Sequence, residues 1–357
     1  MAEKYFLGGM TPGGFFTPLK DIVEGSGYFT YILKGGAGTG KSTLMKKLAE
    51  RFGRTERVTR FYCSSDPESL DAVILHSSKA VVIDGTSPHT MDPVFPGVCQ
   101  RIVDLGRYWD VSLLSPERNN IVAACEKNRS FMTGAAYCSK ALGSICSDTF
   151  CCTENAVNRE ALEALAGDIA GKLSNGQGRT GKEHIRQLSV MTRYGYMTMT
   201  ETLENYPEIF LLEDSCFAAS HMLIDMTAKR AVNAGFDVKL SPCLLFGQRV
   251  WEHLLIEDAG IALVSSNALT GLGTDGAERT DMSRFYDKEK MQPHEKRLEK
   301  DHSLIKELSA ASSELMNSAK LVHDETESFY IRAMDFEKLD KVCERLTEEI
   351  MSQGKIM

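Results

Sequence analysis

Residues 35 to 43, Gly-Gly-Ala-Gly-Thr-Gly-Lys-Ser-Thr, have the residue types and spacing that bind phosphate groups. They match the pattern G-x-x-x-x-G-K-[ST], in which glycines let backbone N–H groups wrap phosphate oxygens. We expect Lys41 to reach the β- and γ-phosphates and Ser42 to ligate Mg2+. An apolar run at 29–33 precedes the motif and a helical pattern follows it, so the sequence predicts a nucleoside triphosphate site, with ATP as the expected nucleotide. The predicted nucleotide-binding residues are Gly35, Gly36, Ala37, Gly38, Thr39, Gly40, Lys41, Ser42 and Thr43.

A second segment, 80–84, reads as an apolar strand that ends in a carboxylate. We expect Asp84 to lie at the carboxyl end of this strand and to hold Mg2+ through water, which makes Ser42 and Asp84 the predicted metal ligands. An ordinary buried strand that stops at an Asp-Gly turn is the alternative. The complete phosphate motif upstream favours the metal role.

Hydrolysis of the nucleotide would need a group to position the attacking water and cations to balance charge. Asp66 follows an apolar run at 58–62 and is expected at the same sheet edge as the phosphate motif, as a base. His89 lies just past Asp84 and could sense the γ-phosphate. The alternatives are that Asp66 caps a following helix and that His89 is an ordinary loop residue. The predicted catalytic residues are Lys41, Asp66, Asp84 and His89.

The chain repeats itself, because four blocks recur in the same order in its two halves. The matched pairs are 9–17 with 190–198, 31–44 with 210–223, 81–84 with 262–265, and 107–110 with 284–287. We therefore predict two repeats, 1–172 and 184–357, joined by a flexible linker at 173–183.

Strands and helical patterns alternate within each repeat, which predicts an α/β fold with a parallel sheet flanked by helices. A P-loop NTPase sheet is thus expected in tandem, each copy followed by a helical segment, at about 113–172 and 288–351. Asp335 is expected to cap the last helix, whose apolar stripe is Leu339, Val342 and Leu346. We expect the helical segments to pack on the sheets; the alternative is an arm that carries the nucleotide cycle to an unidentified protein partner.

The second repeat lacks the residues that bind phosphate and metal. Its counterparts of Gly40, Lys41, Ser42 and Asp84 are Ala219, Ser220, His221 and Ser265, and those of Lys34 and Gly35 are Glu213 and Asp214. Two carboxylates would repel phosphate, so we predict one nucleotide site per chain and a structural or regulatory second repeat. His221 could still donate to an anion. A further G-x-x-x-x-G-K match at 176–182 is rejected, because Glu183 replaces the metal-binding hydroxyl.

The composition is that of a globular protein of 357 residues with a net charge of −8, which makes nucleic acid an unlikely partner. Neither a signal peptide nor an apolar run of membrane-spanning length is present in the sequence, so we expect no membrane partner. The ten cysteines are expected to be reduced thiols, and the predicted location is cytoplasmic.

The chain resembles a bacterial family of tandem P-loop ATPases whose members are mostly described as hypothetical or ATP-binding proteins. The resemblance rests on residues 31–47, 63–66, 84–89 and 334–337. It implies two P-loop NTPase-like repeats with ATP and Mg2+ as cofactors. Members of the family carry an intact P-loop in both halves, whereas the second P-loop is degenerate here.

Three functions fit these residues. The first is a slow ATPase with one active site in the first repeat. The second is a phosphotransferase acting on a small molecule or nucleotide, with Asp66 as the base for a substrate hydroxyl. The third is a non-catalytic, ATP-dependent switch or scaffold.

Overall fold

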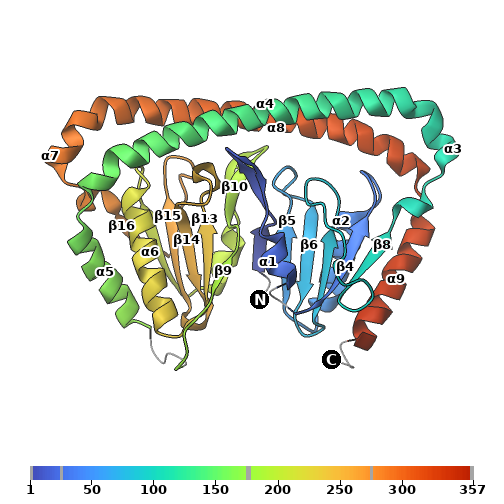
Figure 1. Ribbon diagram of the computed structural model, residues 1–357, viewed down its shortest axis with the longest axis horizontal. Coiled ribbons are helices and arrows are strands. Elements are labelled where there is room, and N and C mark those ends of the chain that lie inside the picture. The colour runs from blue at the N-terminus through green and yellow to red at the C-terminus, as the bar shows by residue number, and fades with distance from the viewer. Residues whose placement is uncertain (1–2, 25–26, 174–177, 274–275, 354–357) are drawn as a thin grey trace. The chain divides into compact units, whose positions relative to one another are not determined.

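The computed structural model describes residues 3–24, 27–173, 178–273 and 276–353. It is a mixed α/β protein with two six-stranded sheets flanked by helices (Figure 1). The chain forms two compact units that each combine distant segments. The first unit contains Met1–Gly8, Thr17–Gly134 and Glu314–Met357, and the second contains Gly9–Phe16 and Ala135–Ser313.

The sheet of the first unit has the strand order β1-β5-β6-β7-β4-β8. Neighbouring strands are parallel except for β6, which is antiparallel to both β5 and β7. The predicted parallel sheet, with a helix between β5 and β7, is therefore wrong at β6. The strands are β1 (Glu3–Phe6), β4 (Phe29–Lys34), β5 (Val58–Tyr62), β6 (Leu70–Leu75), β7 (Ala80–Asp84) and β8 (Gln100–Asp104).

The strand β6 forms because its sequence, Leu-Asp-Ala-Val-Ile-Leu, is a short apolar run whose six residues are all buried. A tight turn precedes it, in which the N–H of Ser69 donates to the carbonyl of Asp66 at 2.8 Å. Short turns can join only antiparallel neighbours, since a parallel connection needs a crossover of a dozen or more residues. The connections on both sides of β6 therefore reverse the chain direction.

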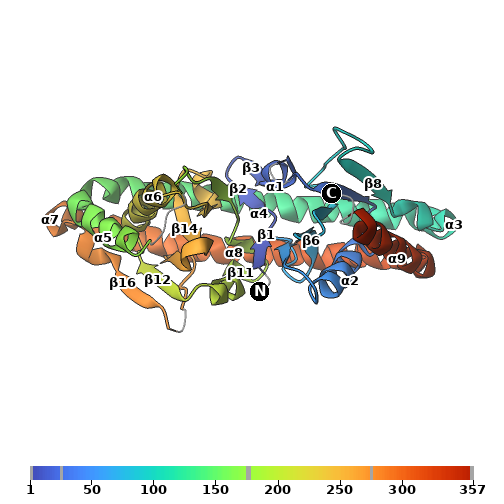
Figure 2. The ribbon, with the colours of Figure 1, turned by 90° about the horizontal axis from the view of Figure 1, so that it is seen from below.

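Helices α2 and α9 pack against this sheet and share its apolar core (Figure 2). The predicted stripe of α9 lies in that core, and the carboxylate of Asp335 accepts a hydrogen bond from the N–H of Lys338 at 3.1 Å, which confirms the predicted cap. None of the helices that the structure describes is both long and apolar enough to cross a membrane. The helices with residues in the first unit are α1 (Leu19–Glu24), α2 (Lys41–Phe52), α3 (Val111–Leu114), α4 (Arg118–Thr153), α8 (Glu295–Ala333) and α9 (Phe336–Gln353).

The second unit has a sheet of order β16-β12-β15-β14-β13-β9, on which α6 packs with α5 beside it (Figures 1 and 2). Its strands are β9 (Glu183–Ile185), β12 (Glu208–Glu213), β13 (Val238–Pro242), β14 (Trp251–Ile256), β15 (Ile261–Ser266) and β16 (Glu278–Asp281). Two hairpins belong to the same unit, β2 (Gly9–Thr11) with β3 (Gly14–Phe16) and β10 (Ser189–Thr192) with β11 (Gly195–Thr198). Its remaining helices are α5 (Arg159–Gly171), α6 (Ala218–Asn233) and α7 (Lys288–Met291).

The two sheets have the same topology and register, which is the arrangement that a duplication would produce. Listed from β1 and from β9, their strands follow the same order with the same directions, including the antiparallel strands β6 and β14. Leu33 pairs with Asp84 in the first sheet, and Leu212 pairs with Ser265 at the matching place in the second. The hairpins also match, since the hydroxyl of Thr11 donates to a glycine carbonyl at 2.8 Å, as does that of Thr192.

The compact units and the sequence repeats divide the chain differently. Helix α5 lies in the first predicted repeat but packs on α6 of the second unit, and α9 lies in the second predicted repeat but packs on α2 of the first unit. Residues 174–177 of the predicted linker lie outside the described residues. The linker ends in strand β9 and not in a helix, which agrees with the rejection of the motif at 176–182.

Candidate functional site

The predicted phosphate motif lies at the carboxyl edge of the first sheet. Strand β4 ends at Lys34 beside β7, which ends at Asp84, and the two strands are parallel neighbours. Residues 35–43, here called the first loop, therefore leave the sheet next to the Asp84 carboxylate. This edge is the place where ligands of α/β proteins bind.

The shape of the first loop depends on glycines. Gly38 and Gly40 have φ angles of 67° and 75°, in the left-handed region that residues with a side chain seldom adopt. A Cβ atom on Gly38 would lie 2.9 Å from the carbonyl of Glu327, and one on Gly40 would lie 2.5 Å from Leu339. Both contacted residues belong to the α8–α9 segment, so helices from the far end of the chain pack on the outer side of this loop.

Lys41 is held inside the first loop. Its Nζ donates to the carbonyls of Gly35 and Gly36 at 2.8 Å each and lies 3.6 Å from Oδ2 of Asp84. The other Asp84 oxygen accepts hydrogen bonds from the N–H and hydroxyl of Thr86, at 2.8 and 2.5 Å. The structure thus brings together the predicted lysine and the predicted metal-binding carboxylate.

Ser42 lies in the first turn of α2, where backbone N–H groups are available to an anion. Its Oγ accepts a hydrogen bond from the N–H of Leu70 at 2.9 Å, which ties the start of α2 to the start of β6. A hydroxyl and a carboxylate are the hard oxygen ligands that suit Mg2+. Ser42 and Asp84 therefore have suitable chemistry for the predicted metal ion.

Asp66 lies in the turn between β5 and β6. Its Oδ2 accepts from the hydroxyl of Ser69 at 2.9 Å and lies 3.5 Å from Nζ of Lys320 on α8. The alternative that Asp66 caps a following helix is wrong, because a strand follows. Sequence reasoning did not find Lys320, which is one of several lysines on a highly charged helix and has no distinguishing spacing.

His89 is buried and is bonded to an acid that the sequence reasoning missed. Its Nε2 lies 2.9 Å from Oδ2 of Asp71, the second residue of β6. Burial and the nearby Asp71 charge raise the pKa of the Cys63 thiol well above its usual value. An acid inside the otherwise apolar run of β6 is the signal that could have identified Asp71.

The Asp71 contact links His89 to β6. The Ser69 and Lys320 contacts link Asp66 to its own turn and to α8. Neither set of contacts includes Lys41.

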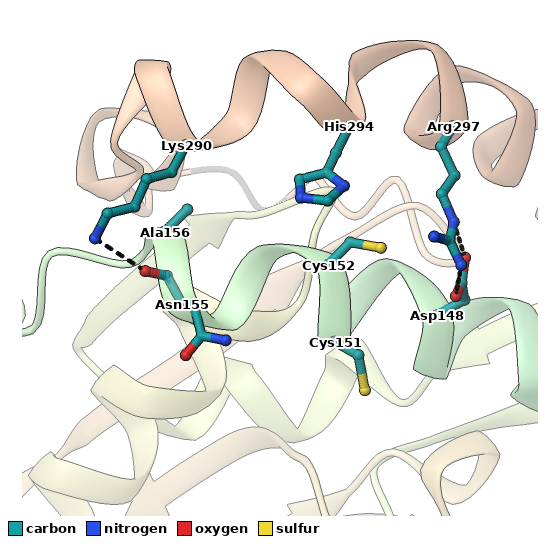
Figure 3. Close-up of a pocket in the computed structure, with 8 residues that line it drawn as sticks. All are labelled: Asp148, Cys151, Cys152, Asn155, Ala156, Lys290, His294 and Arg297. Atoms are coloured by element: carbon teal, nitrogen blue, oxygen red, sulfur yellow. Dashed lines mark hydrogen bonds and ion pairs between the residues drawn. The ribbon is translucent and has the colours of Figure 1, made fainter.

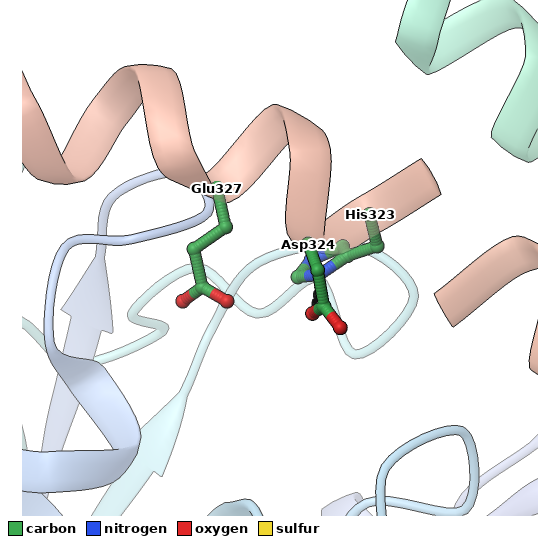
Figure 4. Close-up of side chains that lie close together, drawn as sticks. All are labelled: His323, Asp324 and Glu327. Atoms are coloured by element: carbon green, nitrogen blue, oxygen red, sulfur yellow. Dashed lines mark ion pairs between the residues drawn. The ribbon is translucent and has the colours of Figure 1, made fainter. Parts of the chain in front are cut away.

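Three side chains of α8 that could ligate a metal lie together (Figure 4). The ligand atoms of His323, Asp324 and Glu327 are all within 4.8 Å of one another. Asp324 also forms an ion pair with Lys320, so a neighbouring cation already offsets part of this negative charge. The group is of interest for its position, because the backbone of Glu327 borders Gly38 of the first loop.

The matching loop of the second repeat, residues 214–220, is here called the second loop. A pocket of about 670 Å3 lies over it, and its lining includes Glu213, Asp214, Asp281, Glu295 and Glu299. Lys288 and His302 also line this pocket, so acids outnumber basic side chains there, and repulsion of phosphate stays a prediction. His221 does not fit a donor role at Nδ1, because that atom accepts a hydrogen bond from the N–H of Trp251 at 2.9 Å and burial lowers the pKa of its ring.

A second pocket of about 480 Å3 lies where α4 ends in the second unit (Figure 3). Arg297 forms an ion pair with Asp148 across it, and Lys290 donates to the carbonyl of Asn155. Cys152 lines the pocket, and burial raises the pKa of its thiol, which disfavours the reactive thiolate.

All ten cysteines are free thiols, and their burial varies. In the helical segment where five cysteines crowd, Cys146 is buried whereas Cys125 and Cys151 are exposed. Burial as small apolar residues therefore applies to only part of this group.

The first repeat therefore gathers a lysine, a serine and a carboxylate at one sheet edge, and the second repeat has acids at the matching place. No protein-family model, curated protein or solved structure matches the chain.

Proposed function

We propose that this chain is a cytoplasmic P-loop protein that binds ATP with Mg2+ and hydrolyses it slowly at one site in its first repeat. The second repeat is structural or regulatory in this proposal. The family proposed from the resemblance is that of the bacterial tandem P-loop ATPases, with a degenerate second P-loop.

The observation that carries the proposal is the position of Lys41. Its ammonium group lies between two loop carbonyls and the Asp84 carboxylate, at the N-terminus of α2. A triphosphate at this edge would offer Lys41 phosphate oxygens in place of the Gly35 and Gly36 carbonyls, while the loop N–H groups and the helix dipole favour the same anion. Bound Mg2+ would neutralise phosphate charge, and Ser42 and Asp84 are the residues that would hold it.

The catalytic roles of the remaining acids and His89 stay predictions. Asp66 lies in the turn that ends one residue before Leu70, whose N–H bonds Ser42. A water positioned by Asp66 would therefore approach from the side of the predicted metal ligand. His89 lies in the loop after Asp84 and bonds Asp71. A movement of that loop would therefore move His89, as the proposed role of a γ-phosphate sensor requires.

A second candidate function, an ATP-dependent switch, is favoured by the contacts of the first loop. Gly38 borders the backbone of Glu327 and Ile331, and Gly40 borders Leu339, so α8 and α9 rest on the loop that would surround the phosphates. Lys320 of α8 also contacts Asp66. A change in this loop on nucleotide binding would therefore reach both helices directly.

The test is calorimetric titration of Mg-ATP into the wild type and Lys41→Ala, with phosphate release followed in the same samples. We expect one site per chain in the wild type, with binding and hydrolysis both lost in Lys41→Ala. Lys182→Ala is the matched control, because Lys182 ends the rejected motif of the linker. This variant should bind ATP as the wild type does.

Each alternative outcome has a distinct meaning. Binding without hydrolysis would favour the switch over the ATPase. Hydrolysis that needs an added acceptor would favour a phosphotransferase. Binding that survives Lys41→Ala would overturn the assignment of the site to the first loop.

A further inference from the structure

The second loop keeps one left-handed position of the first loop although it has lost the glycines, whereas Ala219, the counterpart of Gly40, already belongs to α6. Phe217, the counterpart of Gly38, has the same φ angle of 67°. A residue with a side chain in this region costs about 1 to 3 kcal/mol and persists only where its surroundings fix it. The ring of Phe217 is buried and lies 5.3 Å from that of Phe246, which supplies part of that restraint.

The remaining restraint comes from the Asp214 carboxylate, which lies inside the second loop. Oδ1 accepts a hydrogen bond from the N–H of Cys216 at 3.0 Å, and Oδ2 accepts one from the N–H of Ser220 at 2.8 Å. These N–H groups belong to the loop and to the first turn of α6. Asp214 occupies the position of Gly35, where a Cβ in the first loop would lie 2.8 Å from Oγ1 of Thr39.

Tyr286 completes this arrangement. Its hydroxyl donates to both carboxylate oxygens of Asp214, at 2.9 and 3.2 Å, and accepts a hydrogen bond from the N–H of Ala219 at 2.9 Å. The carboxylate and the hydroxyl together therefore satisfy three loop and helix N–H groups. The position that Tyr286 holds in the second repeat is held in the first by Trp109, whose ring lies 3.3 Å from the place of a Cβ on Gly36 and has no hydroxyl.

We propose that the second loop is an anion-binding site whose anion is the chain's own Asp214 carboxylate. Backbone N–H groups at a helix N-terminus are groups that bind phosphate and sulfate in proteins. The carboxylate is covalently attached and does not dissociate, so these N–H groups stay hydrogen-bonded without any added ligand. This proposal does not rest on nucleotide binding at the first loop.

The test removes the internal anion and asks whether an external one replaces it. Asp214→Gly introduces the residue found at position 35. The background carries Lys41→Ala, which weakens anion binding at the first loop, and Trp109→Phe, which leaves Trp251 of the second unit as the fluorescent reporter. Thermal unfolding is followed by Trp251 fluorescence with added pyrophosphate, sulfate or chloride at equal ionic strength. We expect a melting temperature lower by about 5 to 10 °C, because buried N–H groups lose their partner.

Pyrophosphate or sulfate should restore at least half of this loss in a saturable way, and chloride should not. Asp287→Gly is the matched control, because Asp287 accepts hydrogen bonds from the N–H groups of Glu289 and Lys290 at an exposed site of the same unit. Any fall in the melting temperature of Asp287→Gly should not be restored by these anions. An unchanged melting temperature in Asp214→Gly, or a loss that no anion restores, would overturn the proposal.

A measurement on the wild type covers the case in which Asp214→Gly does not fold. Amide hydrogen exchange should show strong protection of Cys216, Ala219 and Ser220 in the absence of any added anion. Rapid exchange at these three amides would contradict a permanently filled loop.

Discussion

Asp71 and Glu252 hold the same place in the two sheets, because each is the second residue of the strand that runs antiparallel to its neighbours. Both are buried. Asp71 bonds His89 at 2.9 Å, whereas Glu252 accepts hydrogen bonds from Asn267 and from the Tyr196 hydroxyl, each at 2.8 Å. The acid is thus present in both repeats although the phosphate motif is present in one. We infer that its common role is to hold the loops at the carboxyl edge.

The shifted pKa of Glu252 predicts that the stability of the second unit depends on pH. Burial raises its pKa from 4.5 to about 7. Below pH 4.5 the folded and unfolded states are both protonated. Between pH 4.5 and 7 the unfolded state releases the proton first, so the free energy of unfolding falls as pH rises, by up to about 3 kcal/mol, and levels off above pH 7. Glu252→Gln should lack this part of the slope.

Urea unfolding at pH 5, 6, 7 and 8 measures this effect, with Trp251 fluorescence as the probe in a Trp109→Phe background. The comparison between Gln and Glu removes the contributions of other titrating groups. Parallel curves for the two proteins would show that Glu252 keeps an ordinary pKa in the fold.

Asp84→Asn tests the metal role of this carboxylate. The amide keeps the shape and the acceptor for Thr86 but removes the charge that would bind Mg2+ and face Lys41. We expect hydrolysis to fall by about 100-fold or more while ATP is still bound. The control is Asp92→Asn, since Asp92 is 79% exposed and bonds Lys34 in the same region. Equal turnover in both variants would remove Asp84 from the site.

Gly38→Ala tests the close approach of α8 to the first loop. The left-handed φ angle alone costs about 1 to 2 kcal/mol for alanine, and the new Cβ would also lie 2.9 Å from the Glu327 carbonyl. Gly97→Ala separates the cost of the φ angle from the cost of the close contact, because Gly97 has a φ of 78° and open space around its Cβ position. We expect a larger loss of thermal stability and of ATP affinity for Gly38→Ala. Equal losses would mean that the helix does not constrain the loop.

Lys320→Ala tests whether α8 restrains the predicted base. The ion pair with Asp66 is partly exposed, so its removal is worth up to about 1 kcal/mol, or up to about fivefold in rate. We expect turnover to rise within that range at unchanged ATP affinity, because Asp66 is released from the pair. Lys338→Ala breaks an exposed pair with Asp335 on α9 and serves as the control. A fall in turnover would instead show that the Lys320 charge supports the reaction.

The sequence was sufficient to predict two repeats and the helical segments, since these follow from repeated blocks and apolar periodicity. It did not predict β6, because an apolar run of six residues has no period that separates a strand from a buried helix turn. Nor did it predict that α5 and α9 pack on the sheets of the opposite repeats. Both sheets have the same topology, so local pattern does not say which of them a helix will cover.

Parts of the candidate site were predictable for a similar reason. Lys41, Ser42 and Asp84 follow from a fixed motif and from the parallel pairing of β4 with β7, which brings their ends together. Asp71, Lys320 and Tyr286 were missed, because their partners are set by contacts between segments far apart in the sequence. Asp214 was recognised as unfavourable for phosphate, but its bonds inside the loop became apparent only with the fold.

The exchange of helices between the repeats has a consequence for the order in which the protein can fold during synthesis. The core of the first unit includes Leu339, Val342, Leu346 and Ile350 of α9, which leave the ribosome after the whole of the second unit. The second unit is complete once residue 313 has emerged. The half of the protein that is made first would therefore be the last to close its core, and nascent chains stalled before α9 should contain a folded second unit and a protease-sensitive first sheet.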